Sequence, residues 1–160
     1  STLGYLLSIE GGIGSGKSTL IRKIITSKIA QSSNFGDLVV TTSQWQHLDA
    51  FYRNLDNAPA YMQFDVLFTL VIPLYLKQQA CWNQIRERSG LSTIIFATLL
   101  SKANLIPQPV LSMIRHAVLH LFRAIYHAVI FVDTPPSTWL QRAIDRNNRL
   151  LKKGDNSRVL

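Results

Sequence analysis

A glycine-rich segment near the amino terminus constrains this chain more than any other feature. Residues 11–18 read GGIGSGKS, which matches the pattern G-x-x-x-x-G-K-S. An apolar run, residues 3–9, comes before this segment, and a helical pattern, residues 18–30, comes after it. In a strand, loop and helix of that order, backbone N–H groups and the positive end of the helix face a bound phosphate. The segment therefore predicts a binding site for a nucleoside triphosphate.

The residue types in this loop have separate chemical roles. We expect Lys17 to reach the outer phosphates as a point charge and Ser18 to offer its hydroxyl to Mg²⁺, with Thr19 adding a second hydroxyl. ATP and Mg²⁺ are therefore the expected ligands. The predicted ATP-binding residues are Gly11, Gly12, Ile13, Gly14, Ser15, Gly16, Lys17, Ser18 and Thr19.

Composition predicts an ordinary globular protein. The chain has 160 residues, of which 47% are hydrophobic and 16% charged, and this suits one domain over residues 1–160. It contains no run of about 18 uncharged apolar residues, so no membrane span is expected. A lone cysteine, Cys81, excludes an internal disulfide and suits a reducing compartment. We therefore expect an intracellular, cytoplasmic protein.

The net charge of +8 raises the question of nucleic-acid binding. The basic residues are unevenly spread, and residues 142–158 hold six of them against two aspartates. Binding of a triphosphate explains such a cluster without a nucleic acid, and the middle of the chain is close to neutral. Nucleic-acid binding is therefore not expected.

Hydrophobic patterns along the chain predict strands that alternate with helices. That order implies a three-layer α/β fold with a central parallel sheet between helices. Besides residues 3–9, strands are expected at residues 38–41 and 128–132. Helices are expected at residues 44–55, 60–86 (kinked at Pro73), 91–102, 110–125 and 136–147.

Several segments resemble the deoxynucleoside kinase family, which includes herpesvirus thymidine kinases and animal deoxynucleoside kinases. The stretch SIEGGIGSGKSTLIRKI is similar to the opening of that family. Glu87, Arg88 and Ser89 resemble its acidic-Arg-Ser motif, and Ser92 and Thr93 follow at the usual offset. Residues 131–149 are similar to the strand, proline-containing turn and arginine-rich helix that lead into the lid. The resemblance extends over nearly the whole chain and implies a P-loop kinase fold.

The resemblance implies ATP-dependent phosphorylation of a deoxynucleoside 5′-hydroxyl. Such chemistry depends on positioning and charge stabilisation. Lys17 and two lid arginines would neutralise charge on the phosphate, and Arg88 would bridge it to the acceptor oxygen. Glu87 would hold Mg²⁺ through water. The implied catalytic residues are Lys17, Glu87, Arg88, Arg142 and Arg146, and the implied metal-binding residues are Ser18 and Glu87.

The resemblance also implies an acceptor site. Gln63 lies where the family has its base-reading glutamine, and Tyr52, eleven residues earlier, matches the tyrosine that contacts the sugar 3′-hydroxyl. Thr93 replaces an aspartate that some relatives carry, which favours thymidine or another pyrimidine deoxynucleoside. The implied substrate-binding residues are Trp45, Tyr52, Met62, Gln63, Arg88 and Phe96.

The chain departs from the family where the general base is expected. Relatives have a Glu-Pro pair at the end of the second strand, but Val40 and Thr41 stand here, with no carboxylate between Asp37 and Asp49. Either of these aspartates substitutes for the base, or the base is missing. A missing base costs around 10²–10⁴-fold in rate.

Two further departures concern the centre and the end of the chain. Residues 82–86 read WNQIR, a polar sequence that is unfavourable for a central strand. Relatives have an apolar strand at this place, before the acidic-Arg-Ser motif. The chain stops at Leu160, shortly after the lid arginines, so we expect a shortened, fragmentary or degenerate member.

The resemblance also implies a possible homodimer, because relatives commonly form one. The apolar helices over residues 60–79 and 110–125 are candidates for that interface.

Other interpretations stay open at this point. A nucleoside monophosphate kinase would need an extra anion site, for which Arg53 or Arg86 is a candidate. A nucleotide-binding relative with weak catalysis would keep the loop and lack the base, and a nucleic-acid binder would show affinity that falls steeply with salt. Glu87 and Arg88 would also suit a solvated ion pair on a surface.

Overall fold

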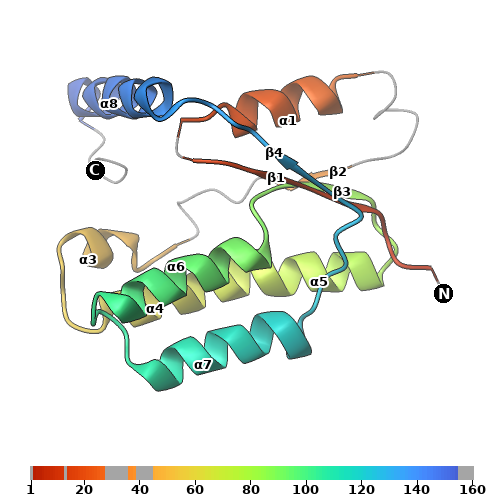
Figure 1. The fold of residues 1–160 in the computed structure, drawn as a ribbon, viewed down its shortest axis with the longest axis horizontal. Helices are drawn as coiled ribbons and strands as arrows, with labels where there is room; N and C mark the ends of the chain where they lie inside the picture. The colour runs from red at the N-terminus through yellow and green to blue at the C-terminus, as the bar shows by residue number, and fades with distance from the viewer. Residues whose placement is uncertain (1, 13, 28–35, 39–44, 155–160) are drawn as a thin grey trace.

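A parallel sheet with helices on both faces forms the centre of the molecule (Figure 1). The computed structural model describes residues 2–12, 14–27, 36–38 and 45–154. The strand order is β2-β3-β1-β4, and each neighbouring pair is parallel. This arrangement confirms the predicted α/β fold. The strands are β1 (Leu6–Glu10), β2 (Gly36–Leu38), β3 (Gln84–Glu87) and β4 (Ala128–Phe131).

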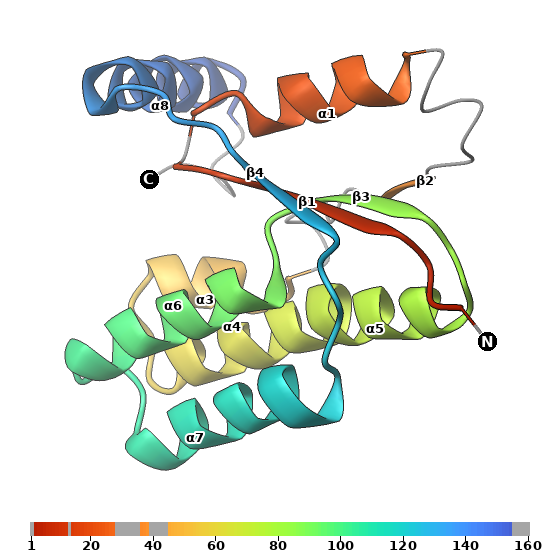
Figure 2. The same cartoon turned by 45° about the vertical axis from the view of Figure 1, so that its right-hand side comes forward.

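Figures 1 and 2 show helices α1 and α8 on one face of the sheet and α4, α5, α6 and α7 on the other. Compared with the sequence predictions, helix α8 runs further and α3 is shorter. The predicted strand over residues 38–41 lies mostly outside the described residues. The helices are α1 (Lys17–Ile25), α3 (Leu48–Tyr52), α4 (Ala58–Val66), α5 (Ile72–Gln79), α6 (Gly90–Lys102), α7 (Gln108–His116) and α8 (Pro136–Lys152), and π-helical turns lie at Leu67–Val71 and Ala117–Leu121.

The prediction of one helix over residues 60–86 is wrong beyond Gln79, because Gln84–Glu87 forms strand β3 in the centre of the sheet. A side-chain nitrogen of Gln84 and one of Arg86 donate to carbonyl groups of the helical segment that precedes the strand. Gln84 Nε2 donates to Leu74 O over 3.3 Å, and Arg86 Nη2 donates to Leu70 O over 3.1 Å. Because these acceptors meet the polar groups, a sequence that looks poor for a central strand is accommodated there.

The disturbance expected at Pro73 takes the form of a π-helical turn. This turn, Leu67–Val71, joins α4 to α5 and ends two residues before Pro73. Proline offers no backbone N–H to the helical ladder, and a π-helical turn is one way in which a helix adjusts. The three segments therefore continue as one helical rod beneath the sheet.

Apolar residues pack in two clusters, one on each side of the sheet. The smaller cluster joins β1, β3 and α1 through Ile9, Ile85 and Ile21. The larger one lies among the helices of the other layer and fixes α6 against α4 and α7. Its buried members are Leu67, Val71, Ala97, Ile106, Leu111, Ile114, Ala117 and Val118.

The helical rod Ala58–Gln79 is long and apolar enough, by length and composition alone, to cross a membrane. Its contacts are those of a core helix. Asp65 is buried and accepts hydrogen bonds from His47, and Gln78 is buried and bonds to Gly4 and Ile125. Core helices of globular proteins commonly pass the same test of length and composition.

Candidate active site

The glycine-rich loop joins the carboxyl end of β1 to the start of α1. Gly14 and Gly16 have φ angles of 73° and 104°, in the left-handed region that favours glycine. Space is also restricted, because a Cβ atom on Gly14 would lie 2.7 Å from Trp139 O. The loop therefore has the conformation that its glycines predict. Ile13 lies outside the described residues.

Lys17 is held inside this loop and is only 4% exposed. Its Nζ donates to Gly11 O over 3.0 Å and to Gly12 O over 2.7 Å. Burial lowers the pKa of Lys17, and the nearby Arg88 lowers it further, whereas Glu87 and Glu10 act in the opposite direction. The lysine and the two glutamates therefore belong to one electrostatic cluster at the end of the sheet.

The Ser18 hydroxyl donates to Glu87 Oε2 over 3.1 Å. This contact brings the first turn of α1 to the end of β3, as the resemblance implied. A hydroxyl and a carboxylate are oxygen ligands of the kind that Mg²⁺ takes, together with waters and substrate phosphates. Within the described residues, no group of three or more His, Cys, Asp and Glu side chains could hold a metal. Ser18 and Glu87 therefore fit a Mg²⁺ ion whose remaining ligands are substrate phosphates and waters.

Arg88 directly follows β3 and has a φ angle of 68°, which is unusual for a residue with a side chain. Its backbone N–H donates to Ile9 O over 2.9 Å, so the turn stays attached to β1. The guanidinium Cζ lies 5.4 Å from the centre of the Phe96 ring. A left-handed backbone of this kind costs about 1–3 kcal/mol and is common at functional sites.

The sequence prediction missed Glu10, the last residue of β1. Its carboxylate accepts hydrogen bonds from Ser92 Oγ over 2.7 Å and from Ser8 Oγ over 3.2 Å. Glu10 directly precedes the phosphate loop, and its bond to Ser92 therefore links the start of the loop to the first turn of α6. A charged residue that ends a buried apolar strand was the sequence signal available for it.

Helix α8 and the turn before it lie against the phosphate loop. Arg142 Nη1 donates to Gly14 O over 3.1 Å, which places this predicted lid arginine at the loop. Thr134 Oγ1 donates to Ser15 O over 2.7 Å. The sequence prediction did not include Thr134 or Trp139, which precede Arg142 and also lie against the loop. Arg146, one turn beyond, is exposed.

Most of the predicted acceptor residues lie on α3, α4 and α6, below the carboxyl end of the sheet in Figure 1, whereas Trp45 precedes α3 and Arg88 lies in the turn before α6. Gln63 is 4% exposed, and none of the described residues hydrogen-bonds to its amide. Met62 beside it is half-buried, and Tyr52 is exposed at the end of α3. The indole N–H of Trp45 donates to Thr69 Oγ1 over 2.9 Å, so this group holds its own segment to the helix.

Thr93 lies in the first turns of α6 and is 3% exposed. Its hydroxyl has no hydrogen-bond partner among the residues that the structure describes. Leaving a buried hydroxyl unpaired costs about 1–3 kcal/mol, which makes such a group a candidate for contact with a ligand.

The structure argues against the anion site suggested for a monophosphate kinase. Arg86 is 0% exposed and donates to Leu70 O, so it cannot reach an acceptor phosphate. Arg53 is exposed and lies 3.4 Å from Asp49, the carboxylate one helical turn before it.

The position of the expected general base is only partly described. Asp49, one of the two aspartates considered as a substitute, is an exposed surface group. Val40 and Thr41 lie outside the described residues.

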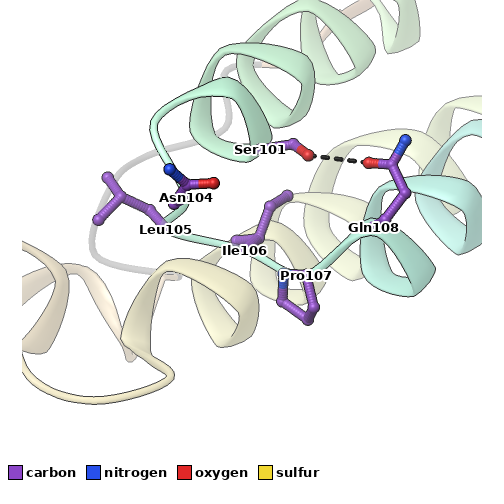
Figure 3. A pocket seen from close by; sticks show the side chains of 6 residues that line it. All are labelled: Ser101, Asn104, Leu105, Ile106, Pro107 and Gln108. Carbon is purple, nitrogen blue, oxygen red and sulfur yellow. Dashed lines mark hydrogen bonds between the residues drawn. The ribbon is translucent and has the colours of Figure 1, made fainter.

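A shallow pocket of about 470 Å³ lies at the turn between α6 and α7 (Figure 3). It is at the far end of α6 from the Glu87 turn, and its lining contains no charged residue. We assign it no part in the chemistry. Its lining residues are Ser101, Asn104, Leu105, Ile106, Pro107 and Gln108.

Solved structures with the same fold are found among kinases. A deoxyadenosine kinase from M. mycoides with dCMP and a flexible dCDP bound is 20% identical, with a TM-score of 0.69 over 88% of this chain and 70% of that one. The same kinase with dATP gives 21% identity and a TM-score of 0.67, over 88% and 71% of the two chains. The same kinase with dCTP is 19% identical and has a TM-score of 0.66, over 88% of this chain and 70% of that one.

Sequence comparisons give the family. Among curated proteins, no sequence matches this chain significantly. The family model described as deoxynucleoside kinase matches residues 7–155, which is almost the whole chain. The match includes the phosphate loop, the Glu87 turn and helix α8. This chain therefore belongs to the deoxynucleoside kinase family.

Proposed function

We propose that this protein transfers the γ-phosphoryl group of ATP to the 5′-hydroxyl of a deoxynucleoside, with thymidine or another pyrimidine deoxynucleoside preferred. The observation that carries the proposal is the 3.1 Å contact between Ser18 and Glu87. It joins the phosphate loop to the acidic-Arg-Ser turn, so one region holds the groups for both donor and acceptor. The proposed unit is one kinase-like domain over residues 1–160.

On the donor side, the loop binds the phosphates through its backbone N–H groups and the amino terminus of α1. Lys17 exchanges its carbonyl partners, Gly11 O and Gly12 O, for the outer phosphates. Arg142 is already at the loop and, with Arg146 one turn later, supplies positive charge to the transferring group. Positioning and charge stabilisation of this kind are the main needs of phosphoryl transfer.

Ser18 and Glu87 are the residues that would hold Mg²⁺. When bound, the ion neutralises charge on the phosphates and orients them. The 3.1 Å hydrogen bond between the hydroxyl and the carboxylate keeps both groups oriented toward one another and close enough to act together.

On the acceptor side, we infer that Arg88, whose guanidinium lies 5.4 Å from the centre of the Phe96 ring, binds the oxygens that exchange the phosphoryl group. Gln63 is 4% exposed and its amide has no hydrogen-bond partner among the described residues, and an amide donates and accepts in one plane, as a pyrimidine edge requires. The Thr93 hydroxyl, which also has no partner in the described part of the chain, adds a small, uncharged group. The M. mycoides kinase structure with products contains dCMP, a deoxynucleoside 5′-monophosphate, which supports a deoxynucleoside acceptor without choosing the base for this chain.

A second candidate function is nucleotide binding with weak catalysis. It is favoured by the sequence between Asp37 and Asp49, which contains no carboxylate. Asp49 is exposed and lies next to Arg53, so it is a poor substitute for a buried base. The two candidates differ in turnover but share binding of ATP.

The test is ATP consumption with Mg²⁺ in the presence of thymidine, deoxycytidine, deoxyadenosine, deoxyguanosine or thymidine monophosphate, with Lys17→Ala as the control. We expect turnover on a pyrimidine deoxynucleoside that disappears in the control. Turnover on thymidine monophosphate alone would favour a monophosphate kinase. Binding of ATP by a folded sample without turnover on any acceptor would leave the second candidate.

Two properties that follow from family membership are also proposals for this chain. We infer a homodimer, for which the apolar helices α4, α5 and α7 are candidate contact elements, and an intracellular location. Sedimentation at several protein concentrations tests the first. Neither an active dimer nor an active monomer would alter the proposed reaction.

A further inference from the structure

A connection of only two residues, Arg88 and Ser89, joins strand β3 to helix α6. The turn reverses the chain from the sheet to the helix layer, with Arg88 in a left-handed conformation. Gly90, the first helical residue, is buried. A Cβ atom there would lie 2.9 Å from Val118 Cγ1, so the turn fits tightly against the helix layer.

A tyrosine from a distant part of the chain bonds to this turn. The Gly90 N–H donates to the Tyr126 hydroxyl oxygen over 2.9 Å. This amide belongs to the first turn of α6, where backbone N–H groups have no partner within the helix. Tyr126 thus supplies from outside the helix the partner that a capping side chain usually supplies.

The backbone on both sides of Tyr126 is itself held. The Gln78 amide accepts from Ile125 N over 2.8 Å and donates to Ile125 O over 2.7 Å. On the other side, His127 N donates to Leu6 O over 3.0 Å, and Leu6 N donates to His127 Nδ1 over 3.1 Å. The tyrosine is therefore fixed to α5 and to the start of β1, and it gives the turn a rigid support.

The first turns of α6 have a second tether, to the residue before the phosphate loop. Ser92 Oγ donates to Glu10 Oε2 over 2.7 Å. Tyr126 and Glu10 thus hold the same short segment, and Arg88 lies just before it. Movement of this segment would displace the guanidinium relative to the loop.

We propose that Tyr126 is a positioning residue, which holds the turn at Gly90 and thereby places Arg88 for phosphoryl transfer. The inference rests on the proposed function, because it assumes that Arg88 contacts the reacting groups. Removing the phenol oxygen leaves the Gly90 N–H buried without a partner and lets the turn relax. A misplacement of about 1 Å in a catalytic group is enough to slow a reaction greatly.

The test compares Tyr126→Phe with Tyr75→Phe. Both changes remove one hydroxyl and keep the ring, but Tyr75 packs edge-on against Phe122 and its hydroxyl has no hydrogen bond in the described part of the chain. We expect Tyr126→Phe to lower kcat about 10-fold, with the KM for ATP unchanged, since one hydrogen bond is lost and the phosphate loop is intact. Tyr75→Phe should match the unmodified protein.

The same two changes are then made in an Arg88→Ala background. If Tyr126 acts through Arg88, Tyr126→Phe has no further effect there, as expected for coupled residues. Faster hydrogen exchange of the Gly90 amide in Tyr126→Phe, measured by NMR on the folded protein, would support the same account. An undiminished effect in the Arg88→Ala background, or equal rates for both phenylalanine variants, would overturn it. An Arg88→Ala variant with full activity would instead refute the proposed role of Arg88 and the inference with it.

Discussion

Ser18 Oγ and Glu87 Oε2 lie 3.1 Å apart, although the two residues are separated by 69 positions in the chain. The first residue belongs to the phosphate loop, whose pattern is specific, and the second to a short motif that would also suit an exposed ion pair. Their contact joins the two motifs in space. It therefore supports a joint role that neither pattern could establish alone.

Glu87→Gln should raise the concentration of Mg²⁺ needed for half-maximal activity about 10-fold or more, because an amide is a much weaker ligand for Mg²⁺ than a carboxylate. The bond from Ser18 can persist, since an amide oxygen also accepts. Titration of Mg²⁺ at saturating ATP measures this. Glu10→Gln is the matched control, and a Mg²⁺ requirement equal to that of the unmodified protein in Glu87→Gln would contradict a metal role.

Arg88→Gly should make the protein more stable and less active. Glycine relieves the left-handed backbone at φ 68°, which we expect to add about 1 kcal/mol to the free energy of unfolding. Loss of the guanidinium should lower kcat about 100-fold or more. Urea unfolding and initial rates measure the two effects. Arg88→Ala keeps the strain and loses the charge, so equal stability of the two variants would show that the backbone is not strained.

Gln63→Leu should weaken binding of the nucleoside without weakening the fold. The buried amide has no partner among the described residues, so its replacement by an apolar group of similar size is nearly neutral for stability. The KM for the nucleoside should rise about 10-fold or more, with the KM for ATP unchanged.

Gln78→Leu is the matched control for that change. Gln78 is also buried, but its amide makes three hydrogen bonds to the backbone of Gly4 and Ile125. Its replacement should therefore lower the free energy of unfolding by about 2 kcal/mol or more. Similar stability losses in the two leucine variants would show that Gln63 is a structural residue.

Lys17 should change the dependence of stability on pH. Its pKa in the folded protein is lowered from 10.5, chiefly by burial, so the unfolded chain keeps the proton to higher pH. Between the lowered value and 10.5, the unfolded state binds more protons, and the contribution of this group to stability rises with pH. Urea unfolding from neutral pH to 10.5 should show this rise in the unmodified protein relative to Lys17→Met. Parallel profiles would contradict the assigned burial of the ammonium group.

The sequence predicted the parts of the fold that depend on local patterns. The phosphate loop and the parallel sheet follow from the glycine spacing and from the alternation of apolar segments. Strand β3 could not be predicted, because the carbonyl groups that accept from Gln84 and Arg86 belong to the preceding helical segment, and its fold against the strand is not visible in a local pattern. Tyr126 was missed because its partner, the Gly90 N–H, lies in another element and no local pattern marks the tyrosine. Glu10 was missed although it is a charged residue at the end of an apolar strand, because its partner Ser92 is 82 positions away.

The most direct test of the account is to identify the product formed from γ-labelled ATP and thymidine. The unmodified protein with Mg²⁺ should form labelled thymidine 5′-monophosphate, Arg88→Ala should form it far more slowly, and Lys17→Ala should form none. If the folded protein binds ATP but transfers label to no deoxynucleoside, the loop and the Glu87 turn do not form a phosphoryl-transfer site. That result would contradict the central claim.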